Sequence, residues 1–143
     1  MTESNSVPPV AAPVLRTLST ARLRKHADYQ RVYQRSRKHF SASMTYFFAD
    51  RLSTAPSGPR VGLTAGRVLG KAVERNRIKR RMREAVRLNL GRLPMTVDVV
   101  LHPRKSVIDM EFAKLEHEVA RIFSTVTSHI DKKTGKTVEG ARQ

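Results

Sequence analysis

The apolar positions along the chain follow two periods, and the changes of period divide it into elements. At residues 27–35, apolar side chains recur every three or four positions, which predicts a short helix. Residues 44–51 alternate β-forming side chains between two faces, which predicts a strand, and 37–43 is a weaker candidate for another. Residues 60–65 predict a further strand, and Gly62 helps to make one of its faces small. That small face leaves room for a groove.

The second half of the chain contains two longer amphipathic helices with an apolar strand between them. Residues 73–90 predict a helix that ends at Gly91 and Pro94. Its apolar seam consists of Val73, Ile78, Met82, Ala85, Val86 and Leu90. Residues 97–102 are apolar nearly throughout, as in a central strand, and 112–126 predict a helix that covers the sheet. The order of elements predicts an α+β domain with two layers around one sheet.

The two ends of the chain lack this periodicity. Residues 1–20 include three prolines and no basic start before the apolar positions, so we expect a flexible tail and not a secretory signal. Residues 129–143 are polar and contain glycine, so a second flexible tail is expected there, with one domain at 21–128. No apolar run approaches the roughly 20 residues that span a bilayer. Because the chain has no cysteine, nothing requires an oxidising compartment, and the cytoplasm is the expected location.

The charge of the chain is strongly one-sided. Lys and Arg total 28 against 12 Asp and Glu, which gives a formal net charge of +16 and favours a polyanionic partner. The predicted helix carries much of this charge, since eight basic residues lie between Gly70 and Arg87 and only Glu74 and Glu84 oppose them. A solvated helix would be better balanced, and a membrane-surface helix would have a larger apolar face. Arginine grips phosphate in two places, so the helix favours a nucleic acid.

Candidate chemistry in the protein itself is sparse. The five histidines are scattered without a metal-ligand spacing, the carboxylates lie on different elements, and there is no phosphate-cradling loop. We therefore predict neither catalytic residues nor a metal site in the protein. Two interpretations of Tyr29 and Tyr33 stay open. They could pack in the core, or they could stack on unpaired bases at about 1 to 3 kcal/mol per base.

The string GKAVERNRIKRRMRE at residues 70–84 resembles the signature of the protein subunit of bacterial ribonuclease P, with Arg75, Asn76 and Arg77 at its Arg-Asn-Arg positions. RLRKHADYQRVY, RVGLTAG and VDVVLHPR support the resemblance, which covers residues 23–126. It implies a two-layer α/β sandwich with a central mixed sheet, a fold shared with a protein of the small ribosomal subunit. The basic helix would form a left-handed crossover between parallel strands, although about 98% of such crossovers are right-handed.

The resemblance also implies a function. The family's protein binds a large catalytic RNA, ribonuclease P RNA, and this RNA acts with Mg²⁺ to cleave precursor tRNA. Hydrolysis of one phosphodiester bond removes the 5′ leader and leaves a 5′-phosphate on the tRNA. The protein would thus be a subunit of an endoribonuclease whose catalysis lies in the RNA. No protein-bound cofactor, membrane or obligate protein partner is expected.

Residues carried over from the family fall into two groups. Those expected to bind the catalytic RNA near its active centre are Arg67, Lys71, Arg75, Asn76, Arg77, Lys79, Arg80 and Arg83. Those expected to hold the single-stranded leader in a central cleft are Tyr29, Tyr33, Phe47, Arg22 and Arg24. The chain departs from the family pattern in two ways. Tyrosine replaces the common Phe on the cleft helix, and Val68 stands where a second basic residue often follows Arg67.

Other classes of protein are compatible with the same basic helix. A non-enzymatic RNA-binding protein, of the ribosomal or RNA-chaperone type, would bind RNA without affecting tRNA maturation. A DNA-binding protein that lays the helix in the major groove is a third interpretation, and it predicts a preference for duplex DNA.

Overall fold

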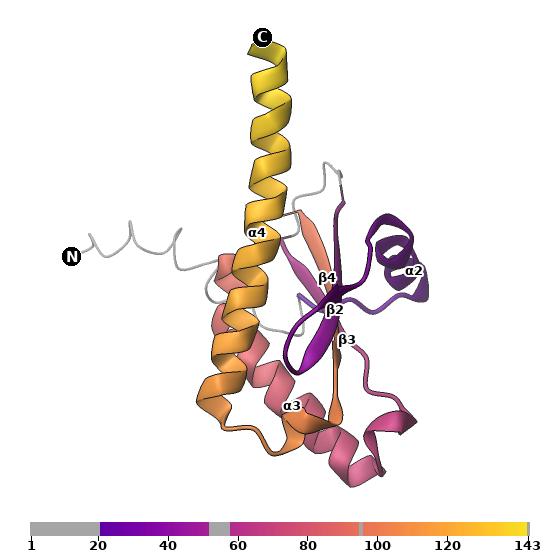
Figure 1. Ribbon diagram of the computed structural model, residues 1–143. Coiled ribbons are helices and arrows are strands. Elements are labelled where there is room, and N and C mark those ends of the chain that lie inside the picture. Colours follow the sequence, from indigo (N-terminus) through magenta and orange to yellow (C-terminus); the bar gives the residue numbers. More distant parts are fainter. Residues whose placement is uncertain (1–20, 52–57, 95, 143) are drawn as a thin grey trace, which may run out of the picture.

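The computed structural model describes residues 21–51, 58–94 and 96–142, with the backbone alone from residue 132 onward. The predicted N-terminal tail at 1–20 lies outside these residues. Across the rest of the chain the elements follow the predicted order, with a helix, three strands, the basic helix, a fourth strand and a last helix (Figure 1). The α+β class is therefore confirmed.

The strands form one four-stranded mixed sheet. They are β1 (His39–Phe40), β2 (Met44–Asp50), β3 (Arg60–Leu63) and β4 (Val97–Pro103), in the spatial order β1-β2-β4-β3. β2 is antiparallel to β1 and β4, whereas β3 is parallel to β4. The chain crosses from β3 to its neighbour β4 through the basic helix, as the family resemblance implied. The handedness of this crossover stays a prediction.

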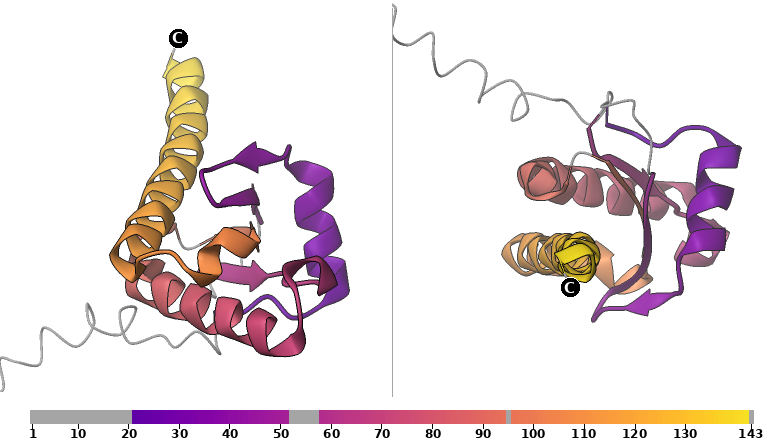
Figure 2. Two further views of the ribbon diagram at one scale, coloured as in Figure 1. Left: turned by 60° about the horizontal axis from the view of Figure 1, so that its bottom comes forward. Right: turned by 90° about the horizontal axis from the view of Figure 1, so that it is seen from above.

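Helices cover the two faces of the sheet unequally. α2 (His26–Arg35) lies on one face, and α3 (Ala72–Asn89) and α4 (Phe112–Arg142) lie together on the other (Figure 2). Three short 3₁₀ turns, at Arg67–Leu69, Leu90–Arg92 and Lys105–Ile108, were not predicted. Such turns are too short to show a period in the sequence.

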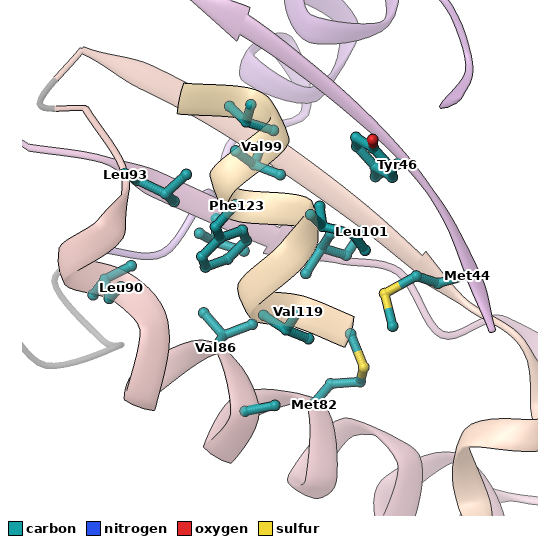
Figure 3. Packing of buried hydrophobic residues seen from close by; sticks show 14 of the residues in the cluster. Met44, Tyr46, Met82, Val86, Leu90, Leu93, Val99, Leu101, Val119 and Phe123 are labelled. Atoms are coloured by element: carbon teal, nitrogen blue, oxygen red, sulfur yellow. The ribbon is translucent and has the colours of Figure 1, made fainter. Parts of the chain in front are cut away.

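The main core lies between the sheet and the helix pair. Alternation along β4 directs Val99 and Leu101 into this core, where they meet Met82 of α3 and Phe123 of α4 (Figure 3). The other residues of the predicted seam are buried as well, with the exception of Val73. Val73 is 79% exposed, so its assignment to the seam was wrong. It lies in the first turn of α3, which Figure 1 shows below the strands.

Two elements differ in length from their predictions. The strand expected at 37–43 is only His39–Phe40, because the chain then turns at once into β2. The last helix was expected to end near Val126 and to give way to a tail, but α4 continues to Arg142. No proline follows Val126 to stop a helix. The final turns of α4 extend past the sheet (Figure 1).

Candidate nucleic-acid interface

The face of the sheet under α2 carries a second, smaller apolar cluster. Val32 of α2, Val100 of β4 and Leu23 of the preceding segment are buried there. The segment before α2 also runs along the edge of β3, where Leu23 N–H donates to the Val61 carbonyl at 3.1 Å and Val61 N–H donates to that of Ala21 at 2.7 Å. These bonds cover the free edge of β3 and fix the start of α2.

Aromatic rings surround this cluster and remain partly accessible. The ring of Tyr33 meets that of Phe47 edge-on, with centroids 4.9 Å apart, and lies 6.5 Å from that of Tyr29. All three are only partly buried. The three aromatic residues of the predicted leader group therefore lie together on one face, in the space between α2 and the sheet.

His102 of β4 is a further member of this site, and it was not predicted from the sequence. Its ring contacts those of Tyr33 and Phe47, at centroid distances of 5.7 and 5.2 Å. Burial lowers the pKa of His102 first of all, and the charge of Lys38 lowers it further. The available signal was the alternation of β4, which directs Asp98, Val100 and His102 to the face opposite the main core.

Gly62 of β3 forms the floor beneath Tyr29. A Cβ atom at this position would lie 2.6 to 2.8 Å from the hydroxyl oxygen and two ring atoms of Tyr29, so only glycine allows the tyrosine to approach this closely. The Tyr29 hydroxyl donates to the Leu23 carbonyl at 3.3 Å. Burial raises the pKa of Tyr29, so the phenol stays neutral. The predicted small face of this strand is thus occupied by an aromatic ring.

A buried ionic network anchors α2 to the sheet beside these rings. Asp98 of β4 is 1% exposed and accepts hydrogen bonds from Arg51 at 2.7 Å and from Arg60 at 2.8 and 2.9 Å. Arg60 also contacts Asp28 of α2 at 3.3 Å, and Asp28 pairs with Arg31 at 3.0 Å. The hydrogen bond to Asp98 raises the pKa of Arg60. Arg60 therefore stays charged, and its bonds to Asp98 and Asp28 hold the helix against the sheet.

On α3, the basic residues divide by the side of the helix they occupy. At about 100° per residue, Arg75, Lys79 and Arg83 follow one another along the flank toward β3. The Nε–H of Arg75 is buried without a hydrogen-bond partner among the described residues. An unpaired buried donor costs about 1 to 3 kcal/mol. An anion that induced this side chain to turn outward would relieve that cost.

Two basic residues of α3 are used within the protein. Arg81 donates from Nε to the Val107 carbonyl at 3.0 Å and also bonds the Met110 carbonyl. Arg87 pairs with Glu84 at 2.5 Å on the exposed surface. Neither arginine was among the predicted RNA-binding residues. The residues expected to bind the catalytic RNA are all exposed, except Arg75 and Lys79, which are half-buried. Val68, where the chain departs from the family pattern, is 88% exposed.

A pocket at the edge of β3 joins the two predicted groups. It has a volume of about 490 Å³, and α3 contributes Lys79 and Arg83 to its wall. The segment before α2 contributes Arg22 and Arg24 to the lining, and α2 contributes Tyr29. One positively charged pocket is thus lined by two residues expected to bind the catalytic RNA and by three expected to bind the leader. No spacing in the sequence indicated this meeting.

Residues 18–127 match the family model described as Ribonuclease P. The chain belongs to the ribonuclease P protein family. A relative from Symbiobacterium thermophilum, named ribonuclease P protein component, is 38% identical over 71% of this chain and 87% of its own length. One of the same name from Finegoldia magna is 33% identical over 72% of this chain and 88% of its own.

Solved structures of family members share the fold. The ribonuclease P protein from Thermotoga maritima aligns with a TM-score of 0.63 at 25% identity, covering 73% of this chain and 96% of its own. The Staphylococcus aureus ribonuclease P protein aligns with a TM-score of 0.60 at 24% identity, over 71% of this chain and 90% of its own. The predicted fold family is confirmed.

The described residues contain no metal-binding group and no helix suited to a bilayer. Among them, nowhere do three or more His, Asp or Glu side chains converge as a metal ion requires. None of their helices combines the length and apolarity needed to cross a membrane.

Proposed function

We propose that the protein binds ribonuclease P RNA along α3 and holds the 5′ leader of precursor tRNA in the cleft under α2. In this way it assists the RNA in removing the leader. The observation that carries this proposal is the pocket at the edge of β3. Its lining residues come from both expected RNA-binding groups, so both RNAs would approach each other there.

The α3 surface suits a folded RNA. Exposed Arg77, Arg80 and Arg83 offer forked donors that bond two phosphate oxygens at once. Phosphate would also supply an acceptor for Arg75, whose Nε–H lacks one. A chain of net charge +16 reduces the repulsion between ribozyme and substrate. The holoenzyme should accordingly need less Mg²⁺ than the RNA alone.

The cleft suits a single strand of RNA. Tyr29, Tyr33 and Phe47 offer ring faces and edges at half-buried positions, and every base can stack on a ring whatever its sequence. A base-paired stem exposes no unstacked base to such rings. Leader contacts would therefore favour precursor over mature tRNA, and this difference would help the product to leave.

Bond cleavage is assigned to the RNA subunit. The resemblance to the family places the divalent ions with the RNA, and we derive no step through them. The protein's part is to neutralise phosphates and to position the leader. Bacterial precursor tRNA is made in the cytoplasm, which is where this protein would act.

Cleavage of a 5′-extended precursor tRNA tests the proposal. The reaction is run at low Mg²⁺ with a bacterial ribonuclease P RNA, with this protein, and with both together. We expect cleavage at the mature 5′ end only when both are present. Cleavage by the protein alone would contradict the assignment of catalysis to the RNA. Tight RNA binding without an effect on cleavage would instead identify an RNA-binding protein of another kind.

Paired variants separate the two surfaces. Tyr29→Ala with Tyr33→Ala should weaken precursor binding while the holoenzyme still assembles. Arg75→Ala with Arg80→Ala should weaken binding to the catalytic RNA and reduce its dependence on salt. If either pair left its own measurement unchanged in a folded protein, the corresponding surface would be wrongly assigned.

A further inference from the structure

Phe40 is a large aromatic side chain with little cover. It lies in β1, the strand at the opposite edge of the sheet from β3, and is 68% exposed. The Lys38 ammonium stands over its ring, 5.7 Å from the centroid. A cation beside an exposed ring is the pairing that proteins use to hold a base together with its phosphate.

The register of the sheet places Phe40 on the face that carries the cleft. Phe40 pairs with Thr45 of β2, and Thr45 pairs in turn with His102 of β4. Its neighbour His39 points to the other face, where its ring stacks on that of Tyr46 at 5.1 Å. Side chains alternate along a strand, so Phe40 shares the face of His102.

The rings on this face thus form a row across all four strands. Tyr29 lies over Gly62 of β3, Tyr33 contacts His102 of β4 and Phe47 of β2, and Phe40 follows on β1. Positive charge stands at both ends of the row. Arg22 and Arg24 lie at the β3 end, and Lys38, close enough to lower the pKa of His102, lies at the β1 end.

We propose that Phe40 and Lys38 form an additional nucleotide-binding position, at which one unpaired base of the leader stacks on the Phe40 ring and its phosphate meets Lys38. This proposal rests on the proposed function. The α3 pocket, where the catalytic RNA would meet the leader, is at the β3 edge. The β1 edge therefore receives leader nucleotides farther from the cleavage site.

An RNA strand fits this position better than a protein partner does. The apolar surface is a single ring and not a patch, and its immediate neighbour is a cation. Exposed Arg37 adds a second positive charge next in the chain. The row also continues without a change of face into the cleft already assigned to RNA.

The test uses the holoenzyme and a series of precursor tRNAs whose leaders are shortened one nucleotide at a time. Phe40→Ala should weaken binding of long-leader precursors by about 5-fold or more, the lower end of one base stack, and should leave the affinity for the shortest leaders and for mature tRNA unchanged. Phe40→Tyr keeps a ring and should restore binding. Lys38→Ala should lower the salt slope for long leaders by about 1.

Two further variants make the result decisive. Leu88→Ala removes another exposed apolar side chain, 49% exposed and in neither RNA-binding group, and should bind every leader like the parent protein. Tyr33→Ala reports on the cleft itself. If Tyr33→Ala weakened the binding of long-leader precursors and Phe40→Ala did not, the additional position would be overturned and the cleft would stand. If neither variant weakened binding, both the additional position and the cleft would be overturned. An equal loss of affinity in Phe40→Ala at all leader lengths would also overturn the proposal. So would a protein that bound the parent and not Phe40→Ala, if the substitution left RNA binding unchanged.

Discussion

The hydroxyl oxygen of Tyr33 lies 2.9 Å from Nε2 of His102, and this contact connects α2 to the central strand β4. Both rings also contact Phe47, so three elements hold the tyrosine in one orientation. A ring that is fixed before binding loses little side-chain freedom when a base stacks on it. The polar contact and the stacking surface are thus two uses of one side chain, and they can be separated by mutation.

Replacing Tyr33 with Phe should separate them. The variant keeps the ring and loses the contact with His102, so precursor affinity should stay within about threefold of the parent. Tyr33→Ala removes the ring and should cost about 1 to 3 kcal/mol of precursor binding. Equilibrium binding of precursor tRNA to the two holoenzymes measures both. Equal losses would mean that the hydroxyl, and not the ring, holds the leader.

His102 should make the folded protein less stable in acid. Its folded-state pKa is lowered from the ordinary 6.5, so the unfolded chain takes up a proton at a higher pH than the folded one. The contribution of His102 to the free energy of unfolding is complete above pH 6.5. It falls as the pH drops from 6.5 to the folded-state pKa, and it levels off below that pKa. Between about pH 7.5 and 5, the melting temperature of His102→Gln should therefore fall less than that of the parent. Parallel curves would contradict this.

Gly62→Ala should damage the cleft from below. The new Cβ would meet the hydroxyl oxygen and two ring atoms of Tyr29 at 2.6 to 2.8 Å, so the ring must move. We expect a loss of about 5-fold or more in precursor affinity, the value of one weak base stack, with unchanged affinity for ribonuclease P RNA. Gly66→Ala is the matched control, because a Cβ there meets nothing within 4 Å. A similar loss in both variants would exclude this mechanism.

Adjacent arginines on α3 should respond differently to removal. Arg80 is exposed, so Arg80→Ala should reduce affinity for ribonuclease P RNA and its salt slope by about 1 while stability is unchanged. Arg81 bonds two backbone carbonyls, so Arg81→Ala should cost about 1 to 3 kcal/mol of folding stability with a smaller effect on RNA binding. Urea unfolding and RNA titration at several salt concentrations distinguish the two roles. The reverse pattern would show that the helix is oriented differently toward the RNA.

Asp98→Asn should be strongly destabilising. It leaves Arg51 and Arg60 beside a neutral side chain at a buried position, and breaking a buried ion pair costs about 3 to 5 kcal/mol. Asp28→Asn should cost only about 1 kcal/mol, because its partner Arg31 is 40% exposed and its other partner, Arg60, keeps Asp98. Urea unfolding measures both. Similar losses from the two variants would mean that the network is not centred on Asp98.

The order of the elements could be predicted from the sequence because period and turn residues are local properties. The helix at α2, the three longer strands and the basic helix follow from spacing alone. Ile78, Met82 and Val86 are buried as their seam predicted, and the Arg-Asn-Arg string was sufficient to indicate the family. Val73 is exposed although it shares the period of the seam, since the sequence does not show where a helix extends past the sheet that it covers.

The composition of the site was decided by the tertiary structure. Arg22 and Arg83 line one pocket although 61 positions (83 − 22) separate them, and Tyr33 meets His102 across 69. Such meetings depend on which strands become neighbours and on the register between them, and neither is a local property. Strand pairing also places Phe40 on the cleft face, because Phe40 pairs with Thr45 and Thr45 pairs with His102. Lys38 lies there with it, over the Phe40 ring. The sequence by itself determined the elements, the excess of positive charge and the family, whereas pairing across the sheet decided which rings and charges lie together.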